Sequence, residues 1–522
     1  MRTVFSSITF FLLAASLLLS ACSSKPSSVP QQFTEVCEAA PIYPDYRDVT
    51  IPPNIAPLNF MVTDSLADAY VMQAGDLVCG AGRDGKFDMD STVWRRILSG
   101  ARGRELAVNV FARRADGWVR FAPFTLHVAE EDIDPYLTYR LIEPGYELYF
   151  QLGIHQRNLT NFDVTTVYEN DRRNGGNSHC INCHMFQNYS TERMILHVRE
   201  NNKGTVVTHG TEAFKMIIAH DSIIASGAYG GWHPTLPLLA FSSNKTAQVF
   251  HYHYPEKIEV YDGESDIILY DAERNEVRNI LRTPDFFETF PSWSPDGTRL
   301  YYCSARLPKF EYTNFEASLV TRFDSLFYDL YSVPFDTVTY TFGEPRLEVE
   351  ASAIQHSCST PRVSPDGRYL LFAYAKYGQF HLYHKDADLW VKPLEVESSK
   401  FLKGQASQSA ERKVESSPSY PLTATNSPDV ESYHAWSSNG RWIVFSSRRD
   451  DGDFTRTYIA YFDRQGQGHR AFLLPQRDPE YNLLLLKSYN CAELTRDAVR
   501  LSEEQFNHVI CHTEAQLATY RE

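Results

Sequence analysis

Residues 293–302 read Trp293-Ser294-Pro295-Asp296-Gly297-Thr298-Arg299-Leu300-Tyr301-Tyr302, a tight turn followed by an apolar strand. Degraded copies begin at Trp232, Val363 and Trp436, so the four anchors are spaced by roughly 60 to 75 residues. Each copy predicts a strand, a hairpin turn at Pro-Asp-Gly or Asn-Gly, and an apolar return strand. No such unit can bury both of its faces alone, so we expect the copies to close into a ring of blades.

The stretch from Trp293 to Arg299 resembles the signature of the WD-like propeller repeats of the TolB family. The other three copies match that pattern less well, and a fainter fifth copy begins at Gln187. The resemblance implies a β-propeller over residues 185–478, with five blades visible. Strands before residue 170 can supply one more, so we expect five to seven four-stranded blades, with six favoured.

The regions around the propeller have their own signals. Residues 41–150 alternate in polarity, as at Leu106, Val108 and Val110, which predicts a small β-sandwich of immunoglobulin-like character. Residues 151–184 are expected to form a connection. Residues 479–522 are expected to form a short, partly helical tail, with helix around Leu483 to Leu486 and from Ala492 onward. The predicted fold class is therefore all-β.

Charge and hydropathy exclude two classes of protein. The net charge of −15 leaves no excess of Lys and Arg to neutralise phosphates, which argues against a nucleic-acid binder. A polytopic membrane protein is also excluded, because the only long apolar run lies at the N-terminus.

The N-terminus predicts export and lipidation. Residues 1–21 have the basic start and short apolar core of a signal peptide, and they end in Leu19-Ser20-Ala21 before Cys22. This end resembles a bacterial lipobox, which implies acylation of Cys22 and a membrane anchor. Residues 22–40 are then a lipidated tether. The residues after Cys22 lack an acidic run, so we expect an outer-membrane lipoprotein that faces the periplasm rather than the cell surface. The alternative is an ordinary signal peptide with an incidental cysteine.

The chemistry is predicted at Cys180-Ile181-Asn182-Cys183-His184. Two thiols at this spacing can add to the vinyl groups of one porphyrin, and the following histidine can bind the iron. The motif therefore predicts one covalent haem c, with His184 as the proximal axial ligand. The alternatives are a disulfide beside a chance histidine and half of a zinc site, although no second Cys-x-x-Cys completes such a site.

The far side of the haem iron can bind a second side chain or stay open. Seven methionines are present and none follows Met216, so a methionine ligand is disfavoured and a His/His or five-coordinate haem is expected. In the predicted propeller the haem motif lies in the connection entering a blade, on the same face as several histidine-rich segments. The candidate distal ligands, in order of preference, are His384 or His251, and then His434.

Six further cysteines remain outside the lipidation and haem motifs: Cys37, Cys79, Cys303, Cys358, Cys491 and Cys511. An even number in an exported protein permits three disulfides in many pairings, and unpaired core thiols are equally compatible. Proximity in sequence favours only a bond between Cys37 and Cys79.

Two classes of function remain. The order of sandwich, haem motif and propeller resembles haem-bearing propeller lipoproteins of Bacteroidetes and, more distantly, the alpha subunit of hydrazine synthase. The first class is a membrane-anchored cytochrome that transfers electrons to or from a periplasmic partner, or a single-haem redox enzyme with an open iron site. The second is a TolB-like binding or assembly module, in which the haem is structural or sensory.

Overall fold

The computed structural model describes residues 25–143, 151–170, 179–251, 253, 254, 256, 258–307, 321–394 and 418–522. These residues form two compact units. The first contains residues up to Asp48, Pro57–Val128 and Pro475–Leu483, and the second contains Val49–Ala56, Ala129–Leu474 and Leu484–Glu522. The predicted signal peptide and the lipidation site Cys22 lie outside the described residues. Among the described helices, none is long and apolar enough to cross a membrane.

The first unit is built on one main sheet with the strand order β1-β8-β7-β5-β6, in which β9 also pairs with β7. The predicted alternation is confirmed, because Leu106, Val108 and Val110 are all buried on β7. The bounds of these elements are β1 (Thr34–Ala39), β5 (Ala69–Ala74), β6 (Leu77–Ala81), β7 (Arg104–Arg114), β8 (Gly117–Ala122), β9 (Phe124–Val128), the pair β2 (Ile42–Tyr43) and β4 (Met61–Val62), and helix α2 (Ser91–Ala101).

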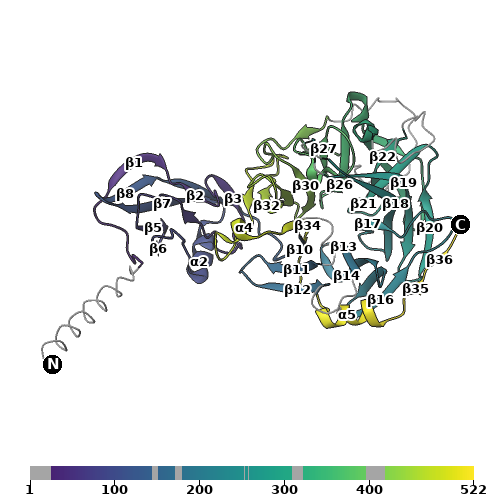
Figure 1. Cartoon of the computed structure of the whole chain (residues 1–522), viewed down its shortest axis with the longest axis horizontal. Helices are drawn as coiled ribbons and strands as arrows, with labels where there is room; N and C mark the ends of the chain where they lie inside the picture. Colours follow the sequence, from purple (N-terminus) through teal and green to yellow (C-terminus); the bar gives the residue numbers. More distant parts are fainter. Residues whose placement is uncertain are drawn as a thin grey trace, which may run out of the picture. The chain divides into compact units, whose positions relative to one another are not determined.

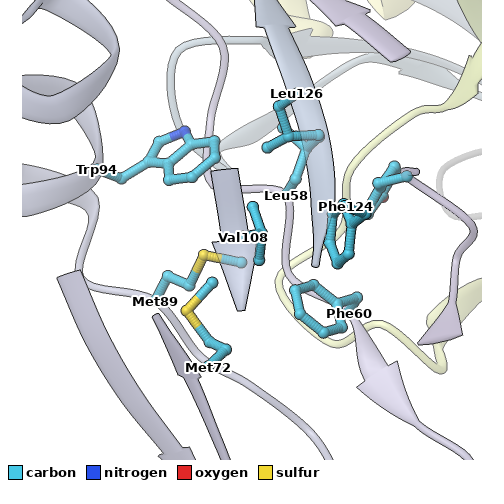
Figure 2. Close-up of a pocket in the computed structure, with 9 residues that line it drawn as sticks. Leu58, Phe60, Met72, Met89, Trp94, Val108, Phe124 and Leu126 are labelled. Atoms are coloured by element: carbon cyan, nitrogen blue, oxygen red, sulfur yellow. The ribbon is translucent and has the colours of Figure 1, made fainter. Parts of the chain in front are cut away.

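Helix α2 covers part of this sheet and was not expected in the predicted sandwich. Asp90 caps its N-terminus, and Trp94 and Leu98, spaced by one helical turn, are its buried residues. Figure 2 shows Trp94 facing Val108 and Leu126 across a small apolar cavity. The cavity measures about 10 Å³, which is no more than the volume a single water needs, so it has no ligand-binding role.

The second unit is a six-bladed β-propeller, as the repeats predicted. Its innermost strands β34, β13, β17, β21, β26 and β30 stand around a common centre (Figure 1). Blade 1 contains β10 (Tyr136–Ile142), β11 (Leu152–Asn158), β12 (Val164–Glu169) and β34 (Ser488–Thr495). Blade 2 contains β13 (His179–Gln187), β14 (Ser190–Glu200), β15 (Gly204–His209), β16 (Glu212–Ile217) and β35 (Gln516–Leu517). Blade 3 contains β17 (Ala228–Trp232), β18 (Leu238–Phe250), β19 (Ile258–Asp271), β20 (Glu276–Leu281) and β36 (Thr519–Tyr520). Blade 4 contains β21 (Phe286–Trp293), β22 (Arg299–Arg306), β23 (Tyr328–Asp336), β24 (Thr341–Phe342) and β25 (Arg346–Val349). Blade 5 contains β26 (Ser357–Val363), β27 (Tyr369–Ala375), β28 (Asp388–Pro393) and β29 (Tyr420–Pro421). Blade 6 contains β30 (Glu431–Trp436), β31 (Trp442–Ser447), β32 (Arg456–Tyr461) and β33 (Phe472–Leu473).

One turn recurs between the first two strands of blades 4, 5 and 6. In each turn a serine hydroxyl donates to the side-chain oxygen two residues later, and the next residue is a glycine with a positive φ of 65–72°. That backbone conformation favours glycine, so local chemistry fixes this turn. The three turns span residues 294–297, 364–367 and 437–440.

The ring closes through a strand from the tail. β34 pairs with β10 and becomes the innermost strand of blade 1, next to β30 of blade 6. Ala492, expected in a helix, therefore lies in a strand, because the chain here is buried and continues the hydrogen-bonded ladder of β10. The tail does form helix α4 (Tyr481–Leu484) and helix α5 (Glu503–His512). Residues 151–184, expected as a connection, supply β11, β12 and part of β13.

Tryptophan side chains join two pairs of neighbouring blades. Trp293 Nε1 donates to the carbonyl oxygen of Gly231 at 3.0 Å, and Trp436 Nε1 donates to that of Arg362 at 3.0 Å.

We expect Trp436→Phe to lower the free energy of unfolding by about 1–2 kcal/mol, because a buried carbonyl loses its donor. Denaturant titration measures this loss. The matched variant Trp232→Phe should cost less, because Trp232 Nε1 has no hydrogen-bond partner among the described residues. Equal losses in the two variants would contradict a stabilising role for the hydrogen bond between Trp436 and the Arg362 carbonyl.

Glu288 on β21 makes stability depend on pH. Burial, with a smaller contribution from the neighbouring Asp266 carboxylate, raises the pKa of this carboxyl to about 7. The unfolded chain releases the proton near the ordinary glutamate pKa of 4.5, so the folded state loses stability as pH rises from about 4.5 to about 7. We expect Glu288→Gln to stabilise the protein by about 1–3 kcal/mol more at pH 8 than at pH 4. Denaturation midpoints at the two pH values measure the difference, and a pH-independent effect would contradict it.

Candidate haem-attachment site

The six innermost strands share one irregularity. In each, the register shifts once: the inner strand advances by three residues while the strand beside it advances by two. This mismatch is the pattern of a β-bulge. The first bulge residue has a positive φ in five strands: Tyr229, Phe290, Thr360, Tyr433 and Cys491. In β13 the shift lies between Ile181 and His184, so the bulge of blade 2 falls inside the haem motif.

This register corrects the predicted position of the motif. Aligning Gln187 with Trp293 placed the motif in the connection before the strand. In the structure Met185 takes the position of Trp293, and all three motif residues lie within β13 itself. The difference arises because the turn after β13 contains only Asn188 and Tyr189, both with positive φ, and the strand runs two residues further.

His184 is fully enclosed on β13. Its side chain is 4% exposed, and neither ring nitrogen has a hydrogen-bond partner among the described residues. Burial, with a smaller contribution from the nearby Arg140 guanidinium, lowers the pKa of His184 to about 3. The imidazole is therefore neutral at physiological pH, which is the form that binds metal ions.

The two motif thiols lie in a polar setting. Cys180 and Cys183 are half-buried, and Cys183 forms no disulfide in the described residues. Burial raises the pKa of the Cys180 thiol, while the positive charge of Arg140 opposes the rise. Arg140, on β10 of the neighbouring blade, donates from Nη1 to the carbonyl oxygen of Ile181 at 3.3 Å. A third thiol, Cys491 on β34, interacts electrostatically with both Arg140 and Cys183, and burial raises its pKa to about 12.

The first predicted distal ligand, His384, is completely buried. Its Nε2 lies 3.1 Å from Glu259 Oε1, and the Tyr377 hydroxyl donates to the same oxygen at 3.0 Å. Among the described residues His384 Nδ1 has no partner. A carboxylate that accepts the N–H of one ring nitrogen leaves the other nitrogen unprotonated and able to bind a metal ion. Histidines that bind metals are commonly oriented in this way.

The other two candidates differ in setting. The ring of His251 lies 4.5 Å from that of Phe323, which in turn contacts Tyr377 at 5.6 Å, so aromatic rings connect His251 to the His384 cluster. His434 lies in the bulge of β30, at the position that Cys183 takes in β13, and is 3% exposed. In the described part of the chain, no hydrogen bond or ring contact joins any of the three histidines to His184.

Sequence reasoning missed several residues of this region. Arg140 directly follows the buried apolar side chains Leu137 and Tyr139 on β10, and a charge in such a strand is a signal that could have identified it. Glu259 gave no signal, because its role depends on a contact with blade 5. The predicted Cys37–Cys79 bond is absent, since both residues are thiols. The described residues contain no cluster of three or more His, Cys, Asp or Glu side chains able to hold a metal ion.

Comparisons with known proteins are limited to the fold. No family model and no curated protein matches the chain. Among solved structures, TolB from Acinetobacter baumannii is 11% identical, with a TM-score of 0.38, over 74% of this chain and 78% of that one. A structure from a study of two prolyl endopeptidases is 9% identical (TM-score 0.30; 65% and 42% covered), and prolyl oligopeptidase B from Galerina marginata is 10% identical (TM-score 0.28; 71% and 49% covered). The chain thus spans less than half of either peptidase chain. The assignment of a propeller rests on the sheet order above, and these scores support no functional argument.

Proposed function

We propose that this protein is a membrane-anchored, extracytoplasmic c-type cytochrome with a β-propeller scaffold. In this proposal Cys180 and Cys183 hold one haem covalently, His184 binds its iron, and Cys22 carries the lipid anchor. Anchored to the outer membrane, the protein then exchanges electrons with a partner protein in the periplasm. The observation that carries the proposal is a buried imidazole, with both ring nitrogens unpartnered in the described residues, directly after two thiols at haem-attachment spacing.

The donor set suits the group. Cys183 is a thiol, and His184 is neutral and has no competing hydrogen bond among the described residues. When bound, a haem supplies a one-electron couple whose potential depends on its axial ligands and surroundings. The chain's part is to hold the attachment strand: β13 pairs with β14 along its length, and Arg140 anchors the Ile181 carbonyl from the neighbouring blade. The buried cation beside the motif would stabilise negative charge there.

For the second axial position we propose His384, with His251 and His434 as further candidates. The carboxylate of Glu259 would orient the His384 ring, and Nδ1 would be the ligand atom. His384 belongs to blade 5 and Glu259 to blade 3, so the contact that orients this ligand also joins two blades of the ring. Spin state distinguishes a second histidine ligand from an open iron site.

The decisive experiment is an absorption spectrum of the full chain, made with a haem-maturation system and its own export signal. We expect a reduced pyridine haemochrome band typical of haem c, and haem that stays with the polypeptide on a denaturing gel. A colourless protein with a Cys180–Cys183 disulfide would refute the cytochrome and leave the binding or assembly module. A high-spin spectrum that shifts with carbon monoxide would instead favour the single-haem enzyme.

The ligand assignment needs variants of the coloured protein. We expect His384→Ala to convert a low-spin spectrum to high spin. Exchange of the half-buried His356, whose ring stacks on Tyr374, for Ala should leave the spectrum unchanged. His251→Ala and His434→Ala test the remaining candidates. If none of the three changes alters the spin state, the distal-ligand proposal is wrong while the haem attachment stands.

A further inference from the structure

Exposed apolar side chains gather at helix α4. Tyr481, Leu483, Leu484 and Leu486 are all exposed, and we call these four residues the α4 patch. Leu484 and Leu486 are the most exposed of them, at 69% and 66%. No other stretch of six residues in the described parts of the chain holds more than two exposed large apolar side chains. Single exposed leucines are ordinary, whereas a cluster of this kind marks an interaction site.

The backbone that carries the α4 patch is held in place. Before the patch, Asn59 Nδ2 donates to the carbonyl oxygen of Arg477 at 2.9 Å. Behind the patch, the guanidinium of Arg456 donates to the carbonyl oxygens of Leu485 at 2.9 Å and Lys487 at 2.6 Å. The exposed leucines are therefore presented to solvent from a backbone that hydrogen bonds fix.

The charges that flank the patch are paired. Lys86 Nζ lies 3.0 Å from Asp478 Oδ1 and 2.5 Å from Glu480 Oε2, just before α4. After the patch, Lys487 Nζ lies 2.8 Å from Glu143 Oε1. An apolar surface bordered by ion pairs and one tyrosine suits the boundary between lipid headgroups and acyl chains, where tyrosine is enriched.

The N-terminal segment brings a membrane within reach of this surface. Pro26 packs so closely on Gly80 of β6 that no side chain would fit at Gly80. Only residues 22–24 separate the proposed lipid on Cys22 from Lys25, where the described chain begins, and they span at most about 10 Å. The first unit contains Pro26, β6 and the residues of α4 up to Leu483. The lipid anchor therefore holds the unit that carries α4 close to the bilayer surface.

We propose that the α4 patch inserts into the bilayer that holds the lipid of Cys22, as a second membrane contact. The leucine side chains enter the acyl-chain boundary, and Tyr481 lies at the level of the headgroups. The inference rests on the lipid anchor of the proposed function, which places the membrane within reach, and it requires no haem. An anchor at one residue lets the first unit rotate at the membrane, and the second contact fixes which side of that unit faces the lipid.

Flotation with vesicles tests this contact without the lipid anchor. The full mature chain with Cys22→Ser, which cannot be lipidated, is mixed with phosphatidylcholine vesicles, whose zwitterionic surface offers no net charge. We expect the chain to float with the vesicles at low and at high salt, because the contact is apolar. Leu484→Ser with Leu486→Ser should weaken this partitioning about tenfold or more. The matched control is Ile354→Ser with Leu517→Ser, which are 65% and 61% exposed on the propeller and should have no effect.

A fluorescence measurement tests insertion itself. In Leu484→Trp, vesicles with brominated acyl chains should quench the fluorescence that the new side chain adds, whereas in Leu517→Trp they should not. The proposal is overturned if the unlipidated chain stays with the buffer, if the double serine variant floats as well as its parent, or if brominated lipid quenches neither tryptophan variant.

Two further results separate the alternatives. Self-association without vesicles that Leu484→Ser with Leu486→Ser abolishes would assign the patch to a second copy of the chain, and would also overturn the proposal. An intact mass that shows no lipid on the native chain would refute the anchor of the proposed function. Flotation of the Cys22→Ser chain still decides whether the α4 patch binds a membrane.

Discussion

Replacing both motif cysteines, in Cys180→Ala with Cys183→Ala, is expected to abolish covalent haem attachment completely. Each thioether bond requires one of these sulfur atoms, and no other thiol lies at the spacing that spans one porphyrin. Both side chains are only half-buried, so the propeller should still fold and be exported. A haem-stained denaturing gel and the intact mass of the purified chain measure the loss.

The matched control is Cys491→Ala. This thiol lies in the bulge of the adjacent strand β34 and interacts with Arg140 and Cys183, yet it belongs to no haem motif. We expect this variant to retain haem at the level of the parent. A stained band in the double variant would refute attachment at residues 180 and 183, and loss of haem in Cys491→Ala would trace both losses to folding rather than to bond formation.

The sequence predicted blades well because their turns are local. The Ser-x-Asp-Gly turn of residues 294–297 forms its hydrogen bonds within four residues, and one glycine provides the backbone conformation. Such a turn can be recognised without knowing what surrounds it. The position of the haem motif was predicted less well, because the short turn at Asn188 and Tyr189 lacks that pattern.

The candidate site depends on contacts that no local pattern encodes. The three predicted distal histidines were expected on one face near the haem, and were identified only by their place in the repeats. The structure buries His384 and His434 and half-buries His251, and it ties His384 to Glu259, which lies 125 residues earlier in the chain. The extended hairpin of β18 and β19 carries Glu259 to blade 5, and its length alone does not reveal that destination.

Closure of the ring was the largest feature that periodicity could not reveal. β34 contains no repeat motif, and its partner β10 lies about 350 residues earlier. Truncating the chain before Ser488 should therefore prevent folding of the propeller. Removal of β34 exposes the edge of β10 and the inner faces of blades 1 and 6, and it deletes the buried side chains Tyr489 and Leu494. The expected cost of about 5–10 kcal/mol matches the whole stability of a typical domain.

A shorter truncation, after Thr513, separates the loss of β35 and β36 from the loss of β34 and α5. It removes β35 and β36, which add only two residues each to the outer edges of blades 2 and 3, and it keeps β34 and α5. We expect this variant to fold cooperatively with a modestly lower melting temperature, measured by circular dichroism, while the longer truncation gives no cooperative transition. If the chain truncated before Ser488 melts cooperatively with native β-sheet content, then β10–β12 form a stable blade without their inner strand, and the ring does not depend on closure.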